Sequence, residues 1–238
     1  MVLYNIDVKK RDLILNIKNN IPSTESFQML LLSKSSKYGK YCVAGIRKDT
    51  HRLCRLVSDD QRSDGAIDEQ YFSGNVNVLD EIIVRNATYT PKGHQVENYL
   101  IDRRYPVEKI RSQKLPESFV EYSIQDLINH YQPIFYSERS CMPEREFHLD
   151  HSLELHFVVG MRTLIGKNYM GQDKTKAYFW CKGIPYKKFS VTDSRFYTQE
   201  QNIGNALILV SLSLEPYGGY FYKYVSGIHM LPKNFLFS

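Results

Sequence analysis

The 238-residue sequence lacks the motifs that mark the common nucleotide-binding and hydrolytic enzymes. It contains no P-loop, no G-x-G-x-x-G motif after a strand and no G-x-S-x-G nucleophile elbow. Their absence excludes the common nucleotide hydrolases and α/β-hydrolases, and it leaves other classes of enzyme open.

Long apolar runs and paired cysteines are also missing. No run of 18 or more apolar residues occurs, and residues 1–20 carry charges where a signal peptide needs an uninterrupted apolar stretch. We therefore expect a cytoplasmic protein that makes no contact with a membrane. Cys42, Cys54, Cys141 and Cys181 form no C-x-x-C pair, which disfavours a zinc ribbon or a disulfide scaffold. The sequence predicts reduced thiols and no cofactor.

The composition is that of a folded, strand-rich protein. Hydrophobic residues make up 42% and charged residues 24%, far from the composition of disordered chains. Tyrosine and phenylalanine number 18 and 12 against one tryptophan, and flat rings suit the pleated surface of a sheet. The net charge of +5 is compatible with a phosphate-bearing partner.

Short apolar runs separated by turn residues predict a mainly β fold of two small barrels joined by one helix. Strand patterns occupy 27–36, 38–46, 51–58, 75–87, 95–102, 153–160, 176–193, 206–213 and 219–231. Residues 116–131 have helical spacing and begin with Pro116. The predicted organisation is an extension over 1–26, a barrel over 27–115, a helix and linker over 116–143, and a barrel over 144–238.

Two segments resemble each other, and several apolar residues are candidates for the core. Residues 38–46 and 218–228 share a glycine, aromatic residues and a small-Gly-Ile ending, so each is a candidate for the equivalent strand of its barrel, or the match is chance. Gly45 and Gly227 would permit a bulge there. The expected core includes residues 30–32, Val43, 207–210 and Val225.

Several ordered segments resemble the prokaryotic dual OB-containing domain. They are LLLSKSSKYGKYCVAGI, RLVS, VENYLID, FSVTDSRF and VSLSLEPYGGYFYKYVSGI, which together span about Phe27 to His229. The resemblance implies two OB-type barrels in tandem, found alone or near phage-defence and mobile-element functions, without an assigned biochemical activity. The chain departs from the family pattern at Leu53-Cys54, where an aromatic or aliphatic residue is usual before the arginine.

Two segments combine basic and aromatic residues, one in each half. The first contains Lys34, Lys37, Tyr38, Lys40, Tyr41, Arg47, Lys48, Arg52 and Arg55, with Asp49 as its single acidic residue. The second runs from Arg162 to Lys188, with Asp173 as its single acidic residue. Its candidate binding residues are Lys174, Lys176, Tyr178, Lys182, Tyr186, Lys187 and Lys188.

Both segments have the residue types with which OB barrels bind single strands. Cationic side chains contact the phosphates while bases stack on exposed rings. The alternative is that these cations cover a solvated sheet face while the rings point inward. We therefore predict a non-catalytic module that binds nucleic acid, single-stranded in preference to duplex. It would act beside a partner with nuclease, helicase or toxin activity.

Two other functions remain open. A nucleotide or signalling-molecule sensor would have a deep pocket lined by polar residues of VENYLID and SVTDSRF, and an interaction subunit of a defence complex would present its tyrosines to a protein. The metal-dependent phosphodiesterase alternative rests on Glu144, Glu146, His148, Asp150, His151, Glu154 and His156. Their spacing matches no metal motif, so we predict no metal site.

Two polar segments are expected to have structural roles. Asp193 follows Thr192 and precedes a serine, so its carboxylate is expected to close a turn by accepting hydrogen bonds from backbone amides. Glu97 and Asn98 lie beside a predicted strand and are expected to make a fixed polar contact between the barrels.

Overall fold

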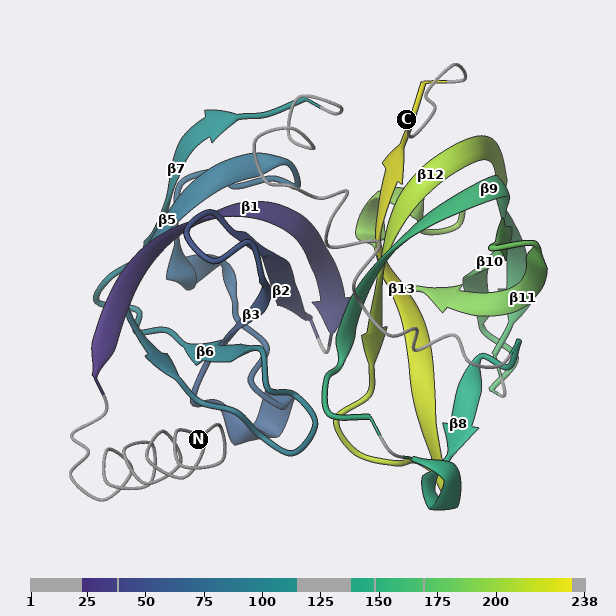
Figure 1. The fold of residues 1–238 in the computed structure, drawn as a ribbon, viewed down its shortest axis with the longest axis horizontal. Helices are drawn as coiled ribbons and strands as arrows, with labels where there is room; N and C mark the ends of the chain where they lie inside the picture. The colour runs from purple at the N-terminus through teal and green to yellow at the C-terminus, as the bar shows by residue number, and fades with distance from the viewer. Residues whose placement is uncertain (1–22, 38, 115–137, 148, 169, 233–238) are drawn as a thin grey trace, which may run out of the picture.

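The computed structural model describes residues 23–37, 39–114, 138–147, 149–168 and 170–232. They form two β barrels that lie side by side (Figure 1). The expected mainly β architecture is therefore confirmed. The helix expected over 116–131 lies outside the described residues, within which the helical segments are short 3₁₀ turns. None of these is long and apolar enough to cross a membrane.

The first barrel closes because its first strand pairs on both sides. Its strands follow the order β1-β2-β3-β6-β5, and β1 also pairs with β5. The pairing of β3 with β6 is parallel, while the others are antiparallel. The strands are β1 (Thr24–Lys37), β2 (Lys40–Arg47), β3 (Leu53–Val57), β5 (Asp80–Tyr89) and β6 (Asn98–Leu100). Two further strands, β7 (Val107–Ser112) beside β5 and β4 (Phe72–Ser73) beside β7, extend this sheet.

The second barrel repeats this topology. Its strands follow the order β11-β10-β9-β12-β13, and a parallel pairing of β11 with β13 closes the sheet. In both barrels the first strand pairs with the second and fourth, and the third lies parallel to the fifth. This is the Greek-key barrel of the OB fold. The strands are β9 (Leu153–Lys167), β10 (Asp173–Cys181), β11 (Ile184–Val191), β12 (Gln201–Leu212) and β13 (Tyr220–Met230), with β8 (Cys141–Pro143) beside β13.

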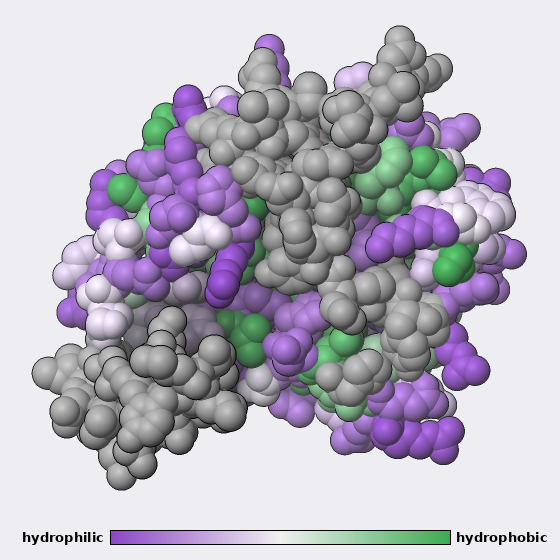
Figure 2. Space-filling model, viewed as in Figure 1, coloured by the Kyte–Doolittle hydropathy of each residue, from purple (hydrophilic) through white to green (hydrophobic). Residues whose placement is uncertain are grey.

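Strand alternation explains how each barrel forms an apolar interior. In β2 and β3 of the first barrel, Val43, Cys54 and Leu56 point inward and are buried among other apolar residues. In the second barrel, Ile208, Val210 and Val225 do the same. The outer surface seen in Figure 2 is largely hydrophilic, with apolar residues in separate patches.

A third apolar cluster joins the barrels. Leu30, Leu32, Ala44, Ile46 and Leu53 of the first barrel pack with leucines of the second, and all five are buried. The partners from the second barrel are Leu153, Leu155, Leu207, Leu209 and Leu231. The residues expected in the core are therefore buried, but some of them lie between the barrels instead of inside one.

Polar contacts fix how the barrels dock. The Glu97 carboxylate accepts hydrogen bonds from the backbone N–H of Ser152 at 2.7 Å, the Ser152 hydroxyl at 3.0 Å and the backbone N–H of Leu153 at 2.9 Å. The hydroxyl of Ser33 donates to the carbonyl of Ser226 at 2.7 Å. The expected inter-barrel contact is confirmed for Glu97, whereas Asn98 bonds within the first barrel.

The two similar segments are not equivalent strands, contrary to the sequence-based expectation. Residues 38–46 lead into β2, the second strand of its barrel, whereas residues 218–228 belong to β13, the fifth. A bulge does lie beside each glycine. At Gly227 a Cβ atom would overlap the carbonyl oxygen of Leu32 in the other barrel. This glycine is therefore required by the close approach of the barrels.

Candidate nucleic-acid interface

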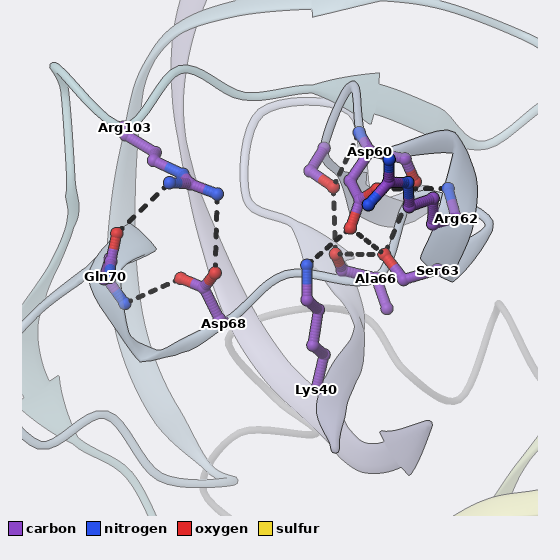
Figure 3. Close-up of polar contacts among 9 residues, drawn as sticks. Lys40, Asp60, Arg62, Ser63, Ala66, Asp68, Gln70 and Arg103 are labelled. Atoms are coloured by element: carbon purple, nitrogen blue, oxygen red, sulfur yellow. Dashed lines mark hydrogen bonds and ion pairs between the residues drawn. The ribbon is translucent and has the colours of Figure 1, made fainter. Parts of the chain in front are cut away.

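The first basic segment is largely neutralised by carboxylates from elsewhere in the chain. Five of its cations form ion pairs, including Lys37 with Asp64 at 3.0 Å and Lys40 with Asp60 at 2.5 Å. Figure 3 shows Lys40 directed at Asp60, whose carboxylate also accepts from Ser63. These contacts lower the pKa of Asp60 to about 2. The same view shows Arg103 held by Asp68 and Gln70.

Arg47 and Arg55 are buried, so the expectation of an exposed cationic face is wrong for both. Arg47 is 5% exposed and donates to Asp49 and Glu25, and its guanidinium lies 4.1 Å from the ring centre of Phe27. Arg55 is 7% exposed and donates to Asn98, and burial lowers its pKa. Both side chains therefore belong to the buried part of the protein and are not presented on an exposed binding face.

The remaining residues of this segment are placed differently from one another. Lys34 lies 4.5 Å from the ring centres of both Tyr41 and Phe72, and it pairs with Glu69. The carboxylate of Glu69 also raises the pKa of Tyr41. Lys48 pairs with Glu81, Arg52 is exposed, and Tyr38 lies outside the described residues. A single strand would therefore meet few unpaired charges here.

The second basic segment places its side chains on an open surface. Along β10, Thr175, Ala177, Phe179 and Cys181 are buried, whereas Lys174, Lys176, Tyr178 and Trp180 alternate with them and point outward. The neighbouring strands add Arg162 from β9, and Lys187 and Lys188 from β11. We call these seven outward residues the β10 face.

The strand register places cations around Tyr178. Arg162 is its direct partner on β9, and the guanidinium lies 5.6 Å from the centre of the tyrosine ring. On the other side, a bulge places both Lys187 and Lys188 opposite Tyr178. Lys188 adopts the left-handed conformation with φ of 63°. A ring among three cations suits a stacked base flanked by phosphates.

Trp180 is the aromatic residue that the sequence interpretation did not select. It is the single tryptophan of the chain, is 49% exposed, and pairs across the sheet with Val159 and Pro185. Gly160 lies beside it and has no side chain to cover the indole ring. The sequence contained a signal for this residue, because Trp180 lies two positions after Tyr178. It therefore falls on the same face of the strand as Lys174, Lys176 and Tyr178.

Not every candidate of the second segment joins the β10 face. Tyr186 is 3% exposed and packs against Phe179 and Phe189, and burial raises its pKa to about 12, so the expectation of an exposed stacking ring is wrong for this residue. Lys182 is exposed in the turn between β10 and β11. Lys176 donates to the hydroxyl of Ser190 at 2.9 Å.

The cations of the β10 face differ from most of those of the first segment, because the described part of the chain offers them no acidic partner. Within the described ranges, Arg162, Lys174, Lys176, Lys187 and Lys188 form no ion pair. Burial and the neighbouring charge of Lys174 lower the pKa of Lys176. Like charges that gather without carboxylates produce a positive potential that attracts an anionic polymer.

Part of the histidine and carboxylate cluster forms a hydrogen-bond network around the buried Glu154. The carboxylate of Glu154 contacts Nε2 of His151 and Nε2 of His156, each at 2.7 Å, and Glu154 is fully buried. His151 also contacts Asp150, and these carboxylates raise its pKa to about 9. His148 lies outside the described residues. Among those described, no three His, Cys, Asp or Glu side chains are arranged to hold a metal ion.

The structure confirms the turn-closing role expected for Asp193. Its carboxylate accepts from the backbone N–H of Arg195 at 3.2 Å and from that of Ile228 at 3.0 Å. Arg195 also forms an ion pair with it. Asp193 therefore anchors a 3₁₀ turn, Ser194–Phe196, to β13.

The family profile of the dual OB-containing domain matches residues 27–228. The chain belongs to this family. Because the match includes both barrels, the dual OB-containing domain is here one unit with a shared core.

Comparison with solved structures finds the tetrameric p202 HIN2, at 11% sequence identity and a TM-score of 0.34. The alignment covers 88% of this chain and 94% of that chain. No curated protein matches this dual OB-containing domain.

Proposed function

We propose that this dual OB-containing domain binds single-stranded nucleic acid along the β10 face. The observation that carries the proposal is the outward alternation of Lys174, Lys176, Tyr178 and Trp180 on a strand that contributes no described residue to the apolar cluster between the barrels. OB folds bind oligonucleotides across their second and third strands, which here are β10 and β11. Stacking on Tyr178 and Trp180 needs unpaired bases, so a single strand is favoured over duplex.

In this proposal the chain supplies binding and a partner supplies the reaction. The partner proposed is a nuclease, helicase or toxin of a prokaryotic defence or mobile-element system. Such a pair would meet its nucleic acid in the cytoplasm. The exposed apolar residues Val159, Trp180 and Ile184 at one end of the β10 face are also suited to a protein contact. A partner surface is therefore the competing function.

A salt series distinguishes the two functions. Binding of a fluorescent 15-nucleotide single strand is measured for the wild type and for the triple variant Lys174→Glu, Lys176→Glu, Lys187→Glu. Each lost phosphate contact reduces the slope of log affinity against log salt by about 0.7, so the slope is expected to flatten by about 2. A duplex of the same sequence is expected to bind more weakly.

The matched control carries the same charge change in the first basic segment: Lys37→Glu, Lys40→Glu, Arg52→Glu. Its slope is expected to equal that of the wild type, because Lys37 and Lys40 already have carboxylate partners. Flattening in this control alone would assign binding to the first segment and contradict the β10 face. No wild-type binding at low salt, where screening is weakest, would leave the partner surface as the better proposal.

A further inference from the structure

The segment that leads into β9, residues 150–154, joins the two barrels. The backbone N–H and the hydroxyl of Ser152 donate to Glu97 of the first barrel, and the backbone N–H of Leu153 donates to the same carboxylate. The Leu153 side chain is buried in the apolar cluster between the barrels. The carbonyl of Ser152 accepts from the backbone N–H of Leu212 in β12. We call residues 150–154 the latch segment.

The histidine of the latch segment lies between two carboxylates of the same segment. Nε2 of His151 is 2.7 Å from Oε1 of Glu154, and Nδ1 is 3.0 Å from Oδ1 of Asp150. A protonated imidazole donates from both ring nitrogens, so both contacts are satisfied when His151 carries its charge. The His151 side chain is 13% exposed, that of Asp150 is 97% exposed and that of Glu154 is fully buried. The imidazolium thus connects a carboxylate at the surface with one in the interior.

Three carboxylates favour the charged form of His151. The hydrogen bond with Glu154 is the largest cause that raises the pKa of His151 to about 9. Asp150 and Glu97 also raise this pKa, while burial opposes them. Other charged or titratable groups lie near the two buried carboxylates: Arg55 and His94 near Glu97, and Lys223, His156 and Cys181 near Glu154.

The charge on His151 stabilises carboxylates that are costly to bury. Glu97 is 6% exposed and Glu154 is fully buried, and a carboxylate removed from water needs a cation or hydrogen bonds to compensate for its lost hydration. Because the pKa of His151 in the folded chain lies above its ordinary value of 6.5, the stabilisation is complete below pH 6.5. It is lost as the pH rises through about 9. One ring nitrogen then no longer donates, and the buried carboxylates lose a neighbouring positive charge.

We infer that the charged His151 is a pH-sensitive latch on the docking of the two barrels. Loss of its proton weakens the contacts that hold the latch segment to Asp150 and Glu154. The N–H groups of Ser152 and Leu153 then separate from the first barrel more readily, because they belong to the same short segment. The inference is independent of the proposed function, since the latch segment and the β10 face share no residue.

Amide hydrogen exchange of the full chain at pH 7 and pH 9.5 tests the inference, with each rate divided by the intrinsic rate at the same pH. In the wild type, protection of the Ser152 and Leu153 amides is expected to fall by about tenfold or more between the two pH values. In His151→Gln, protection is expected to be low at both and to change by less than about twofold. His51→Asn is the matched control and should keep the wild-type fall. His51 is exposed in the turn after β2 and has φ of 54°, which asparagine tolerates.

A second variant, Asp150→Asn, keeps the test decisive if His151→Gln fails to fold, because the Asp150 side chain is almost fully exposed. Removing this carboxylate lowers the pKa of His151, so the loss of protection is expected to begin at lower pH. Unchanged protection in the wild type from pH 7 to pH 9.5, a fall of wild-type size in His151→Gln, or an unshifted fall in Asp150→Asn would each overturn the inference. A failure of oligonucleotide binding leaves these outcomes unchanged, so the two proposals are tested separately.

Discussion

The two barrels share one topology but use the outer faces of their second and third strands in different ways. In the first barrel, Ala44, Ile46 and Leu53 cover this face and pack against leucines of the second barrel. In the second barrel, the corresponding face on β10 and β11 carries lysines, Tyr178 and Trp180 and stays open. The second barrel docks instead through β9, β12 and β13.

Charge follows the same division. Apart from the exposed Arg52, the cations of the first segment have carboxylate partners or are buried, as Lys40 and Arg55 show. Cations on the open face have no acidic partner among the described residues, as for Lys174 and Lys188. A basic segment is therefore a candidate anion site only when its charges are unpaired in the fold. In the proposed function, the first barrel serves as the support and the second as the binding surface.

The strongest way to break this arrangement is to remove apolar volume between the barrels. Leu209→Ala is expected to lower the free energy of unfolding by about 2–5 kcal/mol, because it leaves a cavity at a fully buried site. Urea denaturation followed by circular dichroism measures this change. Ile165→Ala, at a residue 42% exposed, is the control with a small effect. A loss below about 1 kcal/mol for Leu209→Ala would contradict a shared core.

A smaller loss is expected from the polar contact between the barrels. Glu97→Gln replaces a carboxylate that accepts three hydrogen bonds with an amide that has one acceptor oxygen. Hydrogen bonds to charged groups are worth about 1.5–3 kcal/mol, and the free energy of unfolding should fall by about this amount. Thermal and urea denaturation both measure it. Stability equal to wild type would show that the docking depends on the leucines alone.

The role of the open face is tested by truncating its most exposed ring, that of Trp180. Trp180→Ala is expected to weaken single-strand binding by about 1–3 kcal/mol while the salt slope stays unchanged, because stacking releases no ions. Fluorescence anisotropy at several salt concentrations measures both quantities. Tyr105→Ala, which removes a ring 43% exposed on the first barrel, should bind like wild type. A change in the slope of log affinity against log salt in Trp180→Ala would show instead that the ring positions the neighbouring cations against the phosphates.

The smallest effects are expected from single cations of the two segments. Lys40→Ala removes an ion pair near the surface, so we expect a change in unfolding free energy of about 0–1 kcal/mol and no change in salt slope. Lys174→Ala should leave stability unchanged and reduce the slope by about 0.7. Paired titrations and melts compare the two variants. Equal slopes for both would remove the distinction between paired and unpaired charges.

Period-two apolar runs were sufficient to predict the barrels, because each strand must bury one face. The short strands β4, β7 and β8 were not predicted, since two to six residues carry little periodic signal. The first basic segment was misleading for a physical reason. Its partners Asp60, Asp64, Glu69 and Glu81 lie outside the segment and meet it only after folding. Docking of one OB face on the other barrel is likewise a tertiary property.

The close approach of Gly227 to the Leu32 carbonyl and the leucines between the barrels affect how the chain unfolds. Removing either barrel would expose a strip of leucines on the other to water. Each barrel therefore has a complete topology but is not expected to fold stably on its own. Calorimetry of the whole chain should accordingly show a single cooperative transition, with equal van't Hoff and calorimetric enthalpies. Neither barrel alone would then be a stable half of this domain.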